Sequence, residues 1–309
     1  MRSDCSKAHG GIESAFDTHG GVHQSRRSSA RKMKEIDKVN SQRVSVITVC
    51  LNHKEGLDRT LASVVTQSWG DMEHIVIDGG STDGSVKLLE GHRTDKPYVF
   101  VSESDNGLYD AMNKGWRMAD GDLVVFMNAG DTFASEAVVE TIARAHASET
   151  WRWGYGCARI CNANNQPLAI VSFVPFRLDR LALGLSVVPH QATVMEHELL
   201  EELGGFKIEL GPAADQELLL RAALLSQPRL WGEFFADFEG GGVGSSRGWS
   251  AYVRDMGRFR GSLGLYVGGG RVRDKIVTIA LTVYKLGEAG QDKVRRRKGL
   301  LGEALFDAR

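Results

Sequence analysis

The chain has 309 residues, of which 42% are hydrophobic and 25% charged, a composition typical of a globular domain. Its net charge is only −1, but residues 44–246 carry 15 Lys and Arg against 28 Asp and Glu, and residues 247–309 carry 14 against 6. An acidic central region argues against a nucleic-acid partner, which requires a basic face. It favours the binding of divalent cations and polar ligands.

The cysteines do not predict a disulfide or metal framework. Cys5, Cys50, Cys157 and Cys161 are too few to staple a chain of this length. Cys157 and Cys161 form a single C-x-x-x-C without a second pair, which indicates small buried side chains. The opening "MRSDCSKAHGG" lacks the apolar segment of a signal peptide, and no run of about 18 apolar residues predicts a spanning helix. The expected compartment is the cytoplasm.

Three regions are predicted along the chain. Residues 1–43 are rich in Ser, Gly, His and basic residues, which is typical of a disordered leader. Residues 44–246 form the folded domain, and residues 247–309 form a basic helical extension. The domain begins abruptly with the apolar run of residues 44–51, which predicts a strand that is buried on both faces.

Strands and helices then alternate. We expect further strands at 74–78, 98–103 and 122–131, and helices at 56–69, 81–91, 105–119 and 135–147. This alternation predicts an α/β fold with a mainly parallel sheet flanked by helices. After residue 150 the pattern weakens: strands are expected at 151–160, 166–174, 189–195 and 229–239, helices at 197–205 and 213–225, and a glycine-rich turn up to 246.

The extension contains a helix-forming segment, residues 274–288, with a narrow polar stripe of Lys275, Thr278, Thr282 and Lys285. The basic run "KVRRRKG" follows at 293–299. Two interpretations stay open. The helix packs on the domain or on a partner, or it lies in the plane of an anionic membrane surface, where each nearby cation adds about 1 kcal/mol.

Four of the predicted strands end in polar residues: Asn52, Asp78, Glu103 to Asp105, and Asn128 to Asp131. Ligands of parallel α/β sheets bind beyond the carboxyl ends of the strands, so these residues form the candidate site. Asn128 and Asp131 offer an amide oxygen and a carboxylate, which suit a hard cation such as Mg²⁺ or Mn²⁺ that completes its shell with substrate phosphates.

The loop "DGGSTDGS" after the second strand is the second candidate. Asp78 is placed to accept hydrogen bonds from a ribose hydroxyl or a base N–H, and Gly79 and Gly80 let the backbone approach a ligand. Neither the G-x-G-x-x-G fingerprint nor the Walker-type loop is present. A helix cap would explain Ser81 and Thr82, but not two glycines with two aspartates.

Taken in order, "VSVITVCLN", "HIVIDGGSTDGS", "SESDNGLYDAMNKG" and "ADGDLVVFMNAGD" closely resemble the glycosyltransferases of family 2, which have the GT-A fold. "PHQATVM", "LGGF", "AADQELLLR" and "FEGGGVGSS" extend this resemblance over residues 44–246. It implies a donor half at about 44–131 and an acceptor half at about 132–246.

The resemblance also implies roles for particular residues. Asp215 matches the catalytic base, and Asp131 the last aspartate of the metal-binding element, whose earlier position is Asn128 here. Ala214 stands where the family often has an acid, which affects the expected positioning of the base. The donor-binding residues implied are Asn52, Asp78, Asp105, Asp110 and Asn113, and on the acceptor side the residues are His190 and Gln191.

The reaction implied is inverting, metal-dependent transfer from a nucleoside-diphosphate sugar to a saccharide or glycolipid acceptor. Asp215 would take the proton of the acceptor hydroxyl, and the sugar carbon would pass through an oxocarbenium-like state. The expected setting is synthesis of a cell-envelope or surface polysaccharide at the inner membrane face. The sequence does not indicate the donor sugar, the linkage or the oligomeric state.

Two alternatives remain open at this point. Asn128 and Ala214 would also suit a protein that binds a nucleotide-sugar without turning it over. A sugar-phosphate nucleotidyltransferase would need a glycine-rich basic loop after the first strand, where the chain offers Lys54 and Arg59 but only one glycine.

Overall fold

The computed structural model describes residues 42–162, 166–240 and 248–297. The predicted leader lies outside these ranges apart from its last two residues, and so does Cys5. The predicted glycine-rich turn, residues 241–246, also lies outside, as do the side chains of the basic run at 293–299.

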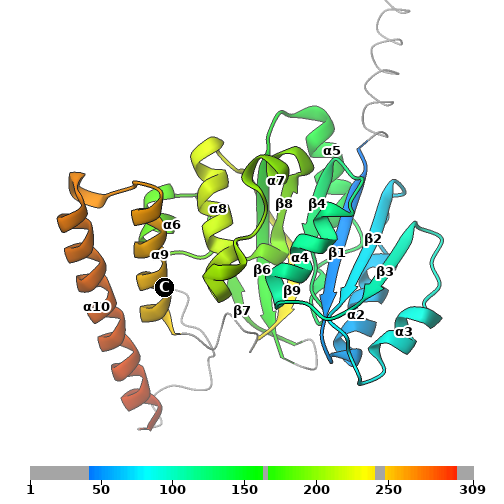
Figure 1. Ribbon diagram of the computed structural model, residues 1–309, viewed down its shortest axis with the longest axis horizontal. Coiled ribbons are helices and arrows are strands. Elements are labelled where there is room, and N and C mark those ends of the chain that lie inside the picture. Colours follow the sequence, from blue (N-terminus) through cyan, green and yellow to red (C-terminus); the bar gives the residue numbers. More distant parts are fainter. Residues whose placement is uncertain (1–41, 163–165, 241–247, 298–309) are drawn as a thin grey trace, which may run out of the picture.

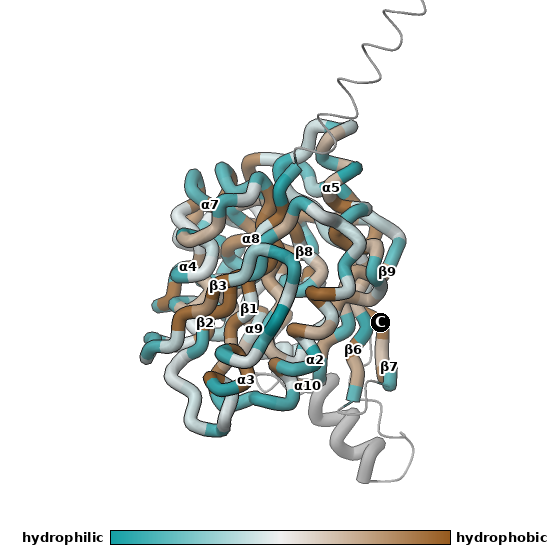
Figure 2. Tube along the Cα trace, turned by 90° about the vertical axis from the view of Figure 1, so that its right-hand side faces the viewer, coloured by the Kyte–Doolittle hydropathy of each residue, from teal (hydrophilic) through white to brown (hydrophobic). Residues whose placement is uncertain are grey.

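A mixed, mostly parallel sheet runs through the centre of the domain, and its apolar strands are surrounded by more polar helices and loops (Figures 1 and 2). Its strand order is β3-β2-β1-β4-β8-β6-β9-β5, with β7 paired to β6. The strands are β1 (Val44–Cys50), β2 (Met72–Asp78), β3 (Tyr98–Ser102), β4 (Leu123–Phe126), β5 (Thr132–Phe133), β6 (Trp153–Cys161), β7 (Pro167–Val171), β8 (Thr193–Glu196) and β9 (Arg229–Glu239).

The first half of the sheet is parallel and the second half is mixed. β1 pairs in parallel with β2 and β4, and β2 pairs in parallel with β3. β8 is antiparallel to both β4 and β6, whereas β6 and β9 are parallel. The carboxyl ends of β1 to β4 therefore share one edge of the sheet, which places the segments that follow these strands close together.

Helices cover both faces of the sheet (Figure 1). They are α2 (Lys54–Val65), α3 (Ser85–Gly91), α4 (Leu108–Arg117), α5 (Val138–Ser148), α6 (Leu178–Leu183), α7 (His197–Leu203), α8 (Ala214–Leu225), α9 (Trp249–Ser262) and α10 (Arg271–Arg297). β1 shows how the pleat divides the core: Ile47 belongs to a cluster that includes residues of α4, α7 and α8, whereas Val46 belongs to a cluster that includes residues of α2 and α5.

Two predicted strands end or begin differently in the structure. β4 ends at Phe126, so Asn128 and Asp131 belong to a turn and not to the strand. The segment 189–195 is a strand only from Thr193, because His190–Ala192 form a 3-10 turn. The amide of Ala192 (3.1 Å) and the hydroxyl of Thr193 (2.9 Å) both donate to the carbonyl of Pro189 and close this turn.

The described cysteines Cys50, Cys157 and Cys161 are free and buried, as expected for small strand residues. α9 packs on α6 and α8, and the hydroxyl of Tyr252 donates to the carbonyl of Ser186 (3.0 Å). Among the helices described here, none combines the length and the apolar character that crossing a bilayer requires.

Close packing of α4 on β1 gives the first prediction. A Cβ added to Gly115 would lie 2.4 Å from Ile47 Cγ2, whereas one added to Gly91 would meet nothing within 4 Å. We expect Gly115→Ala to lower the free energy of unfolding by about 1 to 3 kcal/mol, because the core there has no room. Gly91→Ala should leave it unchanged or raise it by up to about 1 kcal/mol. Urea unfolding measures both, and a stabilised Gly115→Ala would contradict this packing.

Candidate active site

The polar residues that follow β1, β2, β3 and β4 gather at the carboxyl edge of the sheet. Asp78 pairs with Cys50 of β1 on one side and with Ser102 of β3 on the other. On the β4 side, the ring nitrogen Nδ1 of His53 lies 3.2 Å from the carbonyl oxygen of Ala129. The predicted site residues of the first half therefore surround one edge.

Asp78 is fully buried, and its two carboxylate oxygens differ. Oδ2 accepts hydrogen bonds from the N–H groups of Gly80 (3.1 Å) and Ser81 (2.9 Å) and from the hydroxyl of Ser102 (2.7 Å). Oδ1 is buried and has no hydrogen-bond partner in the described part of the chain. Leaving such an acceptor unpaired costs about 1 to 3 kcal/mol, so Oδ1 is suited to a donor that a ligand brings.

Asn52 and Asp105 shape the loop around Asp78. Asn52 Oδ1 accepts the N–H of Thr82 (2.8 Å), which ties the end of β1 to this loop. Asp105 Oδ2 lies 2.6 Å from the position that a Cβ on Gly79 would take, so a side chain at residue 79 would displace this carboxylate. Gly80 adopts a φ of 85°, which turns the next amides toward Asp78. The two glycines are thus explained by the close approach and by the turn.

Asp110 and Asn113, one turn apart on α4, have different surroundings. Asp110 Oδ2 accepts the backbone N–H of Asn106 (2.9 Å), next to Asp105 at the sheet edge. Asn113 is buried, and its amide binds the backbone of Phe206 through both Nδ2 (2.7 Å) and Oδ1 (2.9 Å). These contacts hold the segment after α7 against α4. They do not favour the predicted donor-binding role of Asn113, which stays a prediction.

Asn128 and Asp131 lie in the turn between β4 and β5. Thr60 of α2 holds this turn, because its hydroxyl donates to the carbonyl of Asp131 (2.7 Å). Burial raises the pKa of Asp131 to about 7, although nearby His190 and the side chain of Gln191 act in the opposite direction. Asn128 Oδ1 is buried without a hydrogen-bond partner among the described residues. The turn therefore presents a poorly compensated carboxylate and an unpaired amide oxygen.

His190 connects this turn to Asp215. Its Nε2 lies 3.0 Å from Asn128 Nδ2, and its Nδ1 lies 3.4 Å from Asp215 Oδ2. An amide nitrogen only donates, so Nε2 accepts and the Nδ1–H faces the Asp215 carboxylate. The side chains of His190 and Asp215 are only 15% and 14% exposed. The structure thus brings together Asn128, Asp131, His190, Gln191 and Asp215.

Three further residues surround Asp215, and the sequence analysis did not identify them. The amide of Gln216 donates to the carbonyl of Val188 (2.8 Å) and accepts its N–H (3.2 Å), which fixes the chain just before His190. Burial, with the Asp215 carboxylate adding to it, raises the pKa of Tyr109 well above its usual value, and that of Tyr252 likewise. Both phenols stay protonated beside the carboxylate. No sequence spacing relates these positions.

The departure at Ala214 has a structural explanation. Ala214 is completely buried in the main apolar core, where an acid would be costly unless it were paired with an opposite charge. The acid of this helix that is buried, Glu217, contacts Lys207 (2.7 Å) and Arg221 (2.8 Å) instead. The substitution therefore removes a charge from the core and leaves Asp215 at the start of α8.

A metal ion would have few protein ligands here. In the described ranges, no three His, Cys, Asp or Glu side chains are grouped so that they could hold one. Asp131 and Asn128 still fit a hard cation, because a buried carboxylate and an unpaired amide oxygen both gain from a positive charge. Such an ion would take its remaining ligands from substrate phosphates and water.

The mixed sheet with its flanking helices has the GT-A fold. Residues 45–170 match the profile described as Glycosyl transferase family 2. A glycosyltransferase of Mycobacterium tuberculosis is 39% identical over 232 residues, which cover 74% of this chain and 87% of the relative. The chain belongs to glycosyltransferase family 2, and the predicted family and enzyme class are confirmed.

More distant proteins share the fold. A PGL/p-HBAD biosynthesis glycosyltransferase of Mycobacterium bovis is 27% identical over 189 residues, which cover 60% of this chain and 71% of the relative. The structure of S. aureus TarS 1-349 in complex with UDP-GlcNAc is similar with a TM-score of 0.58 at 16% identity, over 76% of this chain and 70% of that one. A mannosyltransferase from Pyrobaculum calidifontis, in complex with GDP-Man and Mn²⁺, has a TM-score of 0.51 at 16% identity, over 87% and 85%.

The buried carboxylate of Asp131 gives the second prediction. Its pKa is raised in the folded protein, so protonated Asp131 stabilises the fold at low pH, and this contribution is lost as the pH rises from about 4 through about 7. In Asp131→Asn the side chain is a neutral amide of the same shape, so the free energy of unfolding of this variant does not fall over that pH range. With chelator present, the variant should match the wild type at pH 4 and exceed its free energy of unfolding by about 2 to 4 kcal/mol at pH 8.

The matched control is Asp83→Asn. The Ser85 hydroxyl lowers the pKa of Asp83, so this variant should be less stable than the wild type at pH 8. Urea unfolding at both pH values provides the measurement. An Asp131→Asn protein that is less stable than the wild type at pH 8 would contradict an uncompensated carboxylate.

Proposed function

We propose that this glycosyltransferase moves a sugar from a nucleoside-diphosphate sugar to a hydroxyl of a saccharide or glycolipid, with inversion and with the help of Mg²⁺ or Mn²⁺. The observation that carries the proposal is the double contact of His190, with Asn128 on one side and with Asp215 on the other. It brings the residues suited to a cation close to the residue suited to a base. A single displacement requires both groups near one anomeric carbon.

The donor would be held at the carboxyl edge. Asp78 Oδ1, which is buried and unpaired among the described residues, would accept a hydrogen bond from the nucleoside. Asn52 and Asp105 shape the loop that would close around it, and Asp110 lies beside this loop. The complexes of TarS with UDP-GlcNAc and of the Pyrobaculum enzyme with GDP-Man and Mn²⁺ support a nucleotide-sugar and a divalent ion.

Asp131 and Asn128 would hold the cation through a carboxylate and an amide oxygen. When bound, a divalent ion neutralises the charge that develops on a leaving diphosphate. Burial raises the pKa of Asp131 to about 7, so protons compete with a cation for this carboxylate near neutral pH. Metal binding should therefore weaken as the pH falls below 7.

Asp215 would act as the base. The acceptor oxygen forms its bond to the anomeric carbon as the bond to the diphosphate breaks, and the electron pair leaves with the diphosphate. The acceptor proton moves to the Asp215 carboxylate. His190 would orient this carboxylate through its Nδ1–H, and Gln216 and the two protonated tyrosines would fix its position. His190 and Gln191 remain the proposed residues of the acceptor side.

The acceptor and its cellular setting are proposed from a relative of this chain and from the basic extension. Similarity to a PGL/p-HBAD biosynthesis glycosyltransferase supports an envelope saccharide or glycolipid as the product class. A glycolipid acceptor would place the enzyme peripherally at the inner face of the membrane. The basic extension is the part of the chain suited to that surface.

A catalytically degenerate nucleotide-sugar-binding protein is the second candidate. The sparse metal ligands, with Asn128 in place of an acid, favour it. Both candidates bind the donor, but only the enzyme consumes it.

Asp215→Asn separates them and is the third prediction. The amide keeps the shape of the side chain but cannot take a proton, so sugar transfer or donor hydrolysis should fall by about 10²- to 10⁴-fold. Donor affinity, measured by calorimetry, should stay unchanged. Glu209→Gln, which alters an exposed acid just before α8, should affect neither quantity. Equal turnover by Asp215→Asn and wild type would refute the base, and a wild type without turnover would favour the binding protein.

The fourth prediction concerns the cation. A donor present at 100 times its dissociation constant should raise the free energy of unfolding by about 2.7 kcal/mol. We expect a thermal-shift screen of nucleotide-sugars to find the donor in the presence of Mn²⁺ and to lose most of the shift in chelator. Asp131→Asn should reduce the difference between the two conditions. A full shift in chelator would contradict a bridging ion.

A further inference from the structure

The last helix of the structure packs with its polar side inward. Arg260 of α9 is 1% exposed, and its guanidinium contacts Asp274 Oδ1 (2.9 Å) and Thr278 Oγ1 (2.7 Å) of α10. A Cβ on Gly257 would lie 2.5 Å from Thr278 Cγ2, so the two helices approach closely there. Thr278, Thr282 and Lys285 of the predicted polar stripe therefore face the domain, whereas Lys275 is exposed, and polar contacts set the orientation of the helix.

The apolar side of α10 consequently faces outward. Val272, Ile276, Ile279, Val283 and Leu286 are between 56% and 73% exposed. Their spacing of four and three residues places them on one face of the helix, along about four turns. Burying such side chains yields about 1.5 to 3 kcal/mol each, so a continuous exposed stripe of this size indicates a binding surface.

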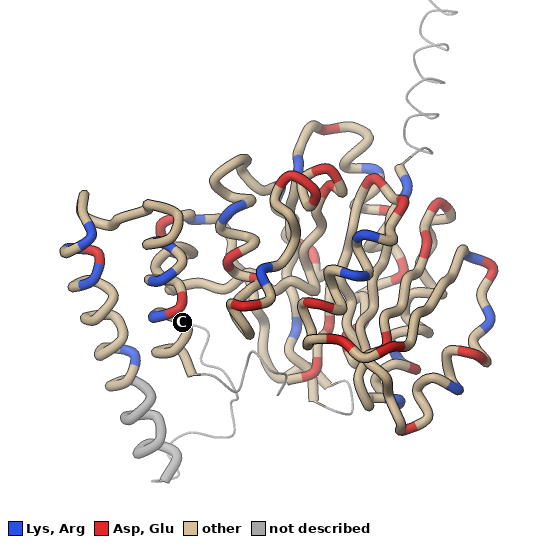
Figure 3. Tube along the Cα trace, in the orientation of Figure 1, with Lys and Arg blue, Asp and Glu red and all other residues tan. Residues whose placement is uncertain are grey.

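The exposed charges around this stripe are all of one sign. In residues 249–287, the exposed charged residues are Arg254, Arg258, Arg271, Arg273 and Lys275. The two acids in that range are buried: Asp255 pairs with Arg258, and Asp274 with Arg260. Figure 3 shows α9 and α10 at the end of the molecule opposite the donor-side strands.

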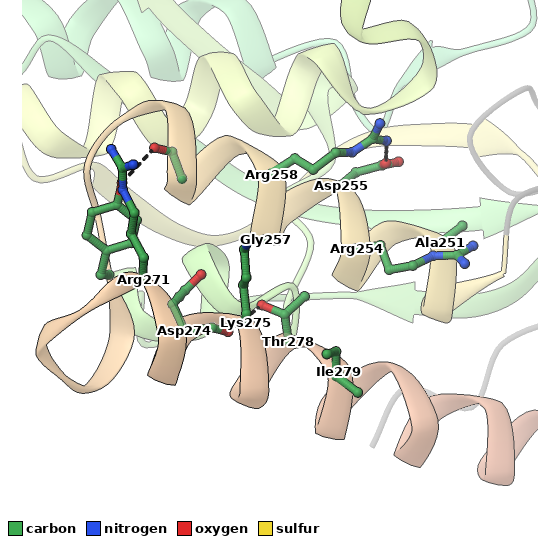
Figure 4. A pocket seen from close by; sticks show the side chains of 12 residues that line it. Ala251, Arg254, Asp255, Gly257, Arg258, Arg271, Asp274, Lys275, Thr278 and Ile279 are labelled. Carbon is green, nitrogen blue, oxygen red and sulfur yellow. Dashed lines mark hydrogen bonds and ion pairs between the residues drawn. The ribbon is translucent and has the colours of Figure 1, made fainter.

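Some of these cations line a groove between α9 and α10, where they are spread along its length (Figure 4). Its volume is about 840 Å³, and its charged lining is Arg254, Arg258, Arg271 and Lys275 together with Asp255 and Asp274. The two acids pair with Arg258 and with Arg260, which leaves the groove with an excess of positive charge. Ile279 of the apolar stripe also lines it. The groove thus offers cationic donors to phosphate oxygens directly beside a surface that prefers hydrocarbon.

The exposed charges beside the stripe distinguish two occupants of this surface, a second copy of the chain and an anionic bilayer. In a pair of α10 helices from two copies of this chain, Arg273 and Lys275 would flank the stripe on each copy, and like charges would meet across the contact. An anionic bilayer offers the opposite charge to the cations and an apolar layer to the stripe.

We propose that α9 and α10 dock the enzyme on a bilayer that contains anionic phospholipid. The stripe of α10 enters the boundary between headgroups and acyl chains, and the groove of Arg254, Arg258, Arg271 and Lys275 receives lipid phosphate. The helix lies in the plane of the membrane. This inference deepens the proposed function by placing the active site near a lipid-linked acceptor, but the binding surface is separate from the catalytic residues.

Vesicle co-sedimentation of the full chain tests the proposal. Binding should be strong to vesicles of phosphatidylcholine and phosphatidylglycerol in equal parts and weak to phosphatidylcholine alone. Ile276→Ser with Val283→Ser should weaken binding by roughly a hundredfold, from the apolar groups lost. Arg273→Gln with Lys275→Gln should weaken it by about thirtyfold and reduce its salt dependence.

Matched variants control for general effects of hydrophobicity and charge. Ile170→Ser removes an apolar side chain that is 53% exposed on β7, and Lys87→Gln with Arg93→Gln removes two exposed cations from the donor half. Both should bind vesicles as the wild type does. Because all these changes lie on the surface, circular dichroism should show unchanged folding.

Two results would overturn the proposal. One is vesicle binding that the α10 variants leave intact. The other is a combination of two observations. Sedimentation velocity without lipid shows a dimer that Ile276→Ser with Val283→Ser converts to a monomer, and the wild type does not bind vesicles. Calorimetry of donor binding on the same variants should match the wild type. A negative vesicle-binding result would therefore not affect the proposed transfer reaction. A negative result with Asp215→Asn would likewise not affect the proposed docking surface.

Discussion

The imidazole of His190 joins two parts of the chain that the sheet alone would not align. Its Nε2 receives the amide of Asn128 from the turn after β4, and its Nδ1 faces Asp215 at the start of α8. Both contacts depend on the 3-10 turn at His190–Ala192 and on Gln216, which holds Val188 just before it. Since one small ring touches both groups, a cation at the turn would act on the leaving diphosphate and a base at Asp215 on the attacking hydroxyl, on two sides of one anomeric carbon.

The buried acids of the domain differ in how well the fold compensates their charge, and this difference distinguishes structural acids from those suited to a ligand. Glu217 is compensated by Lys207 and Arg221, and one oxygen of Asp78 by three hydrogen-bond donors. Asp131 is supported only in part, by His190 and the side chain of Gln191, and burial still raises its pKa to about 7. A charge that the folded protein compensates only in part is a cost in stability, and a bound cation would reduce that cost. In the same way, the unpaired Oδ1 of Asp78 costs stability, and a ligand that donates a hydrogen bond to it would remove that cost.

The sequence was sufficient for the class of fold and for the edge that carries the site. Buried strands have continuous apolar runs, and parallel strands bring their ends to one edge, so Asp78 and Asp131 could be placed without coordinates. It was insufficient for the contact between His190 and Asp215, which depends on a turn closed by Thr193. It was also insufficient for α10: periodicity separates two faces, but buried Arg260 determines that the polar one packs inward.

Crystals grown with Mn²⁺ and a nucleoside-diphosphate sugar would test the central claim most directly, through an anomalous difference map at the manganese edge. The account predicts one strong peak beside Asp131 and Asn128, bridged to the diphosphate, with the anomeric carbon of the sugar on the side that faces Asp215. A peak at another surface, or a sugar whose anomeric carbon is turned away from Asp215, would contradict it.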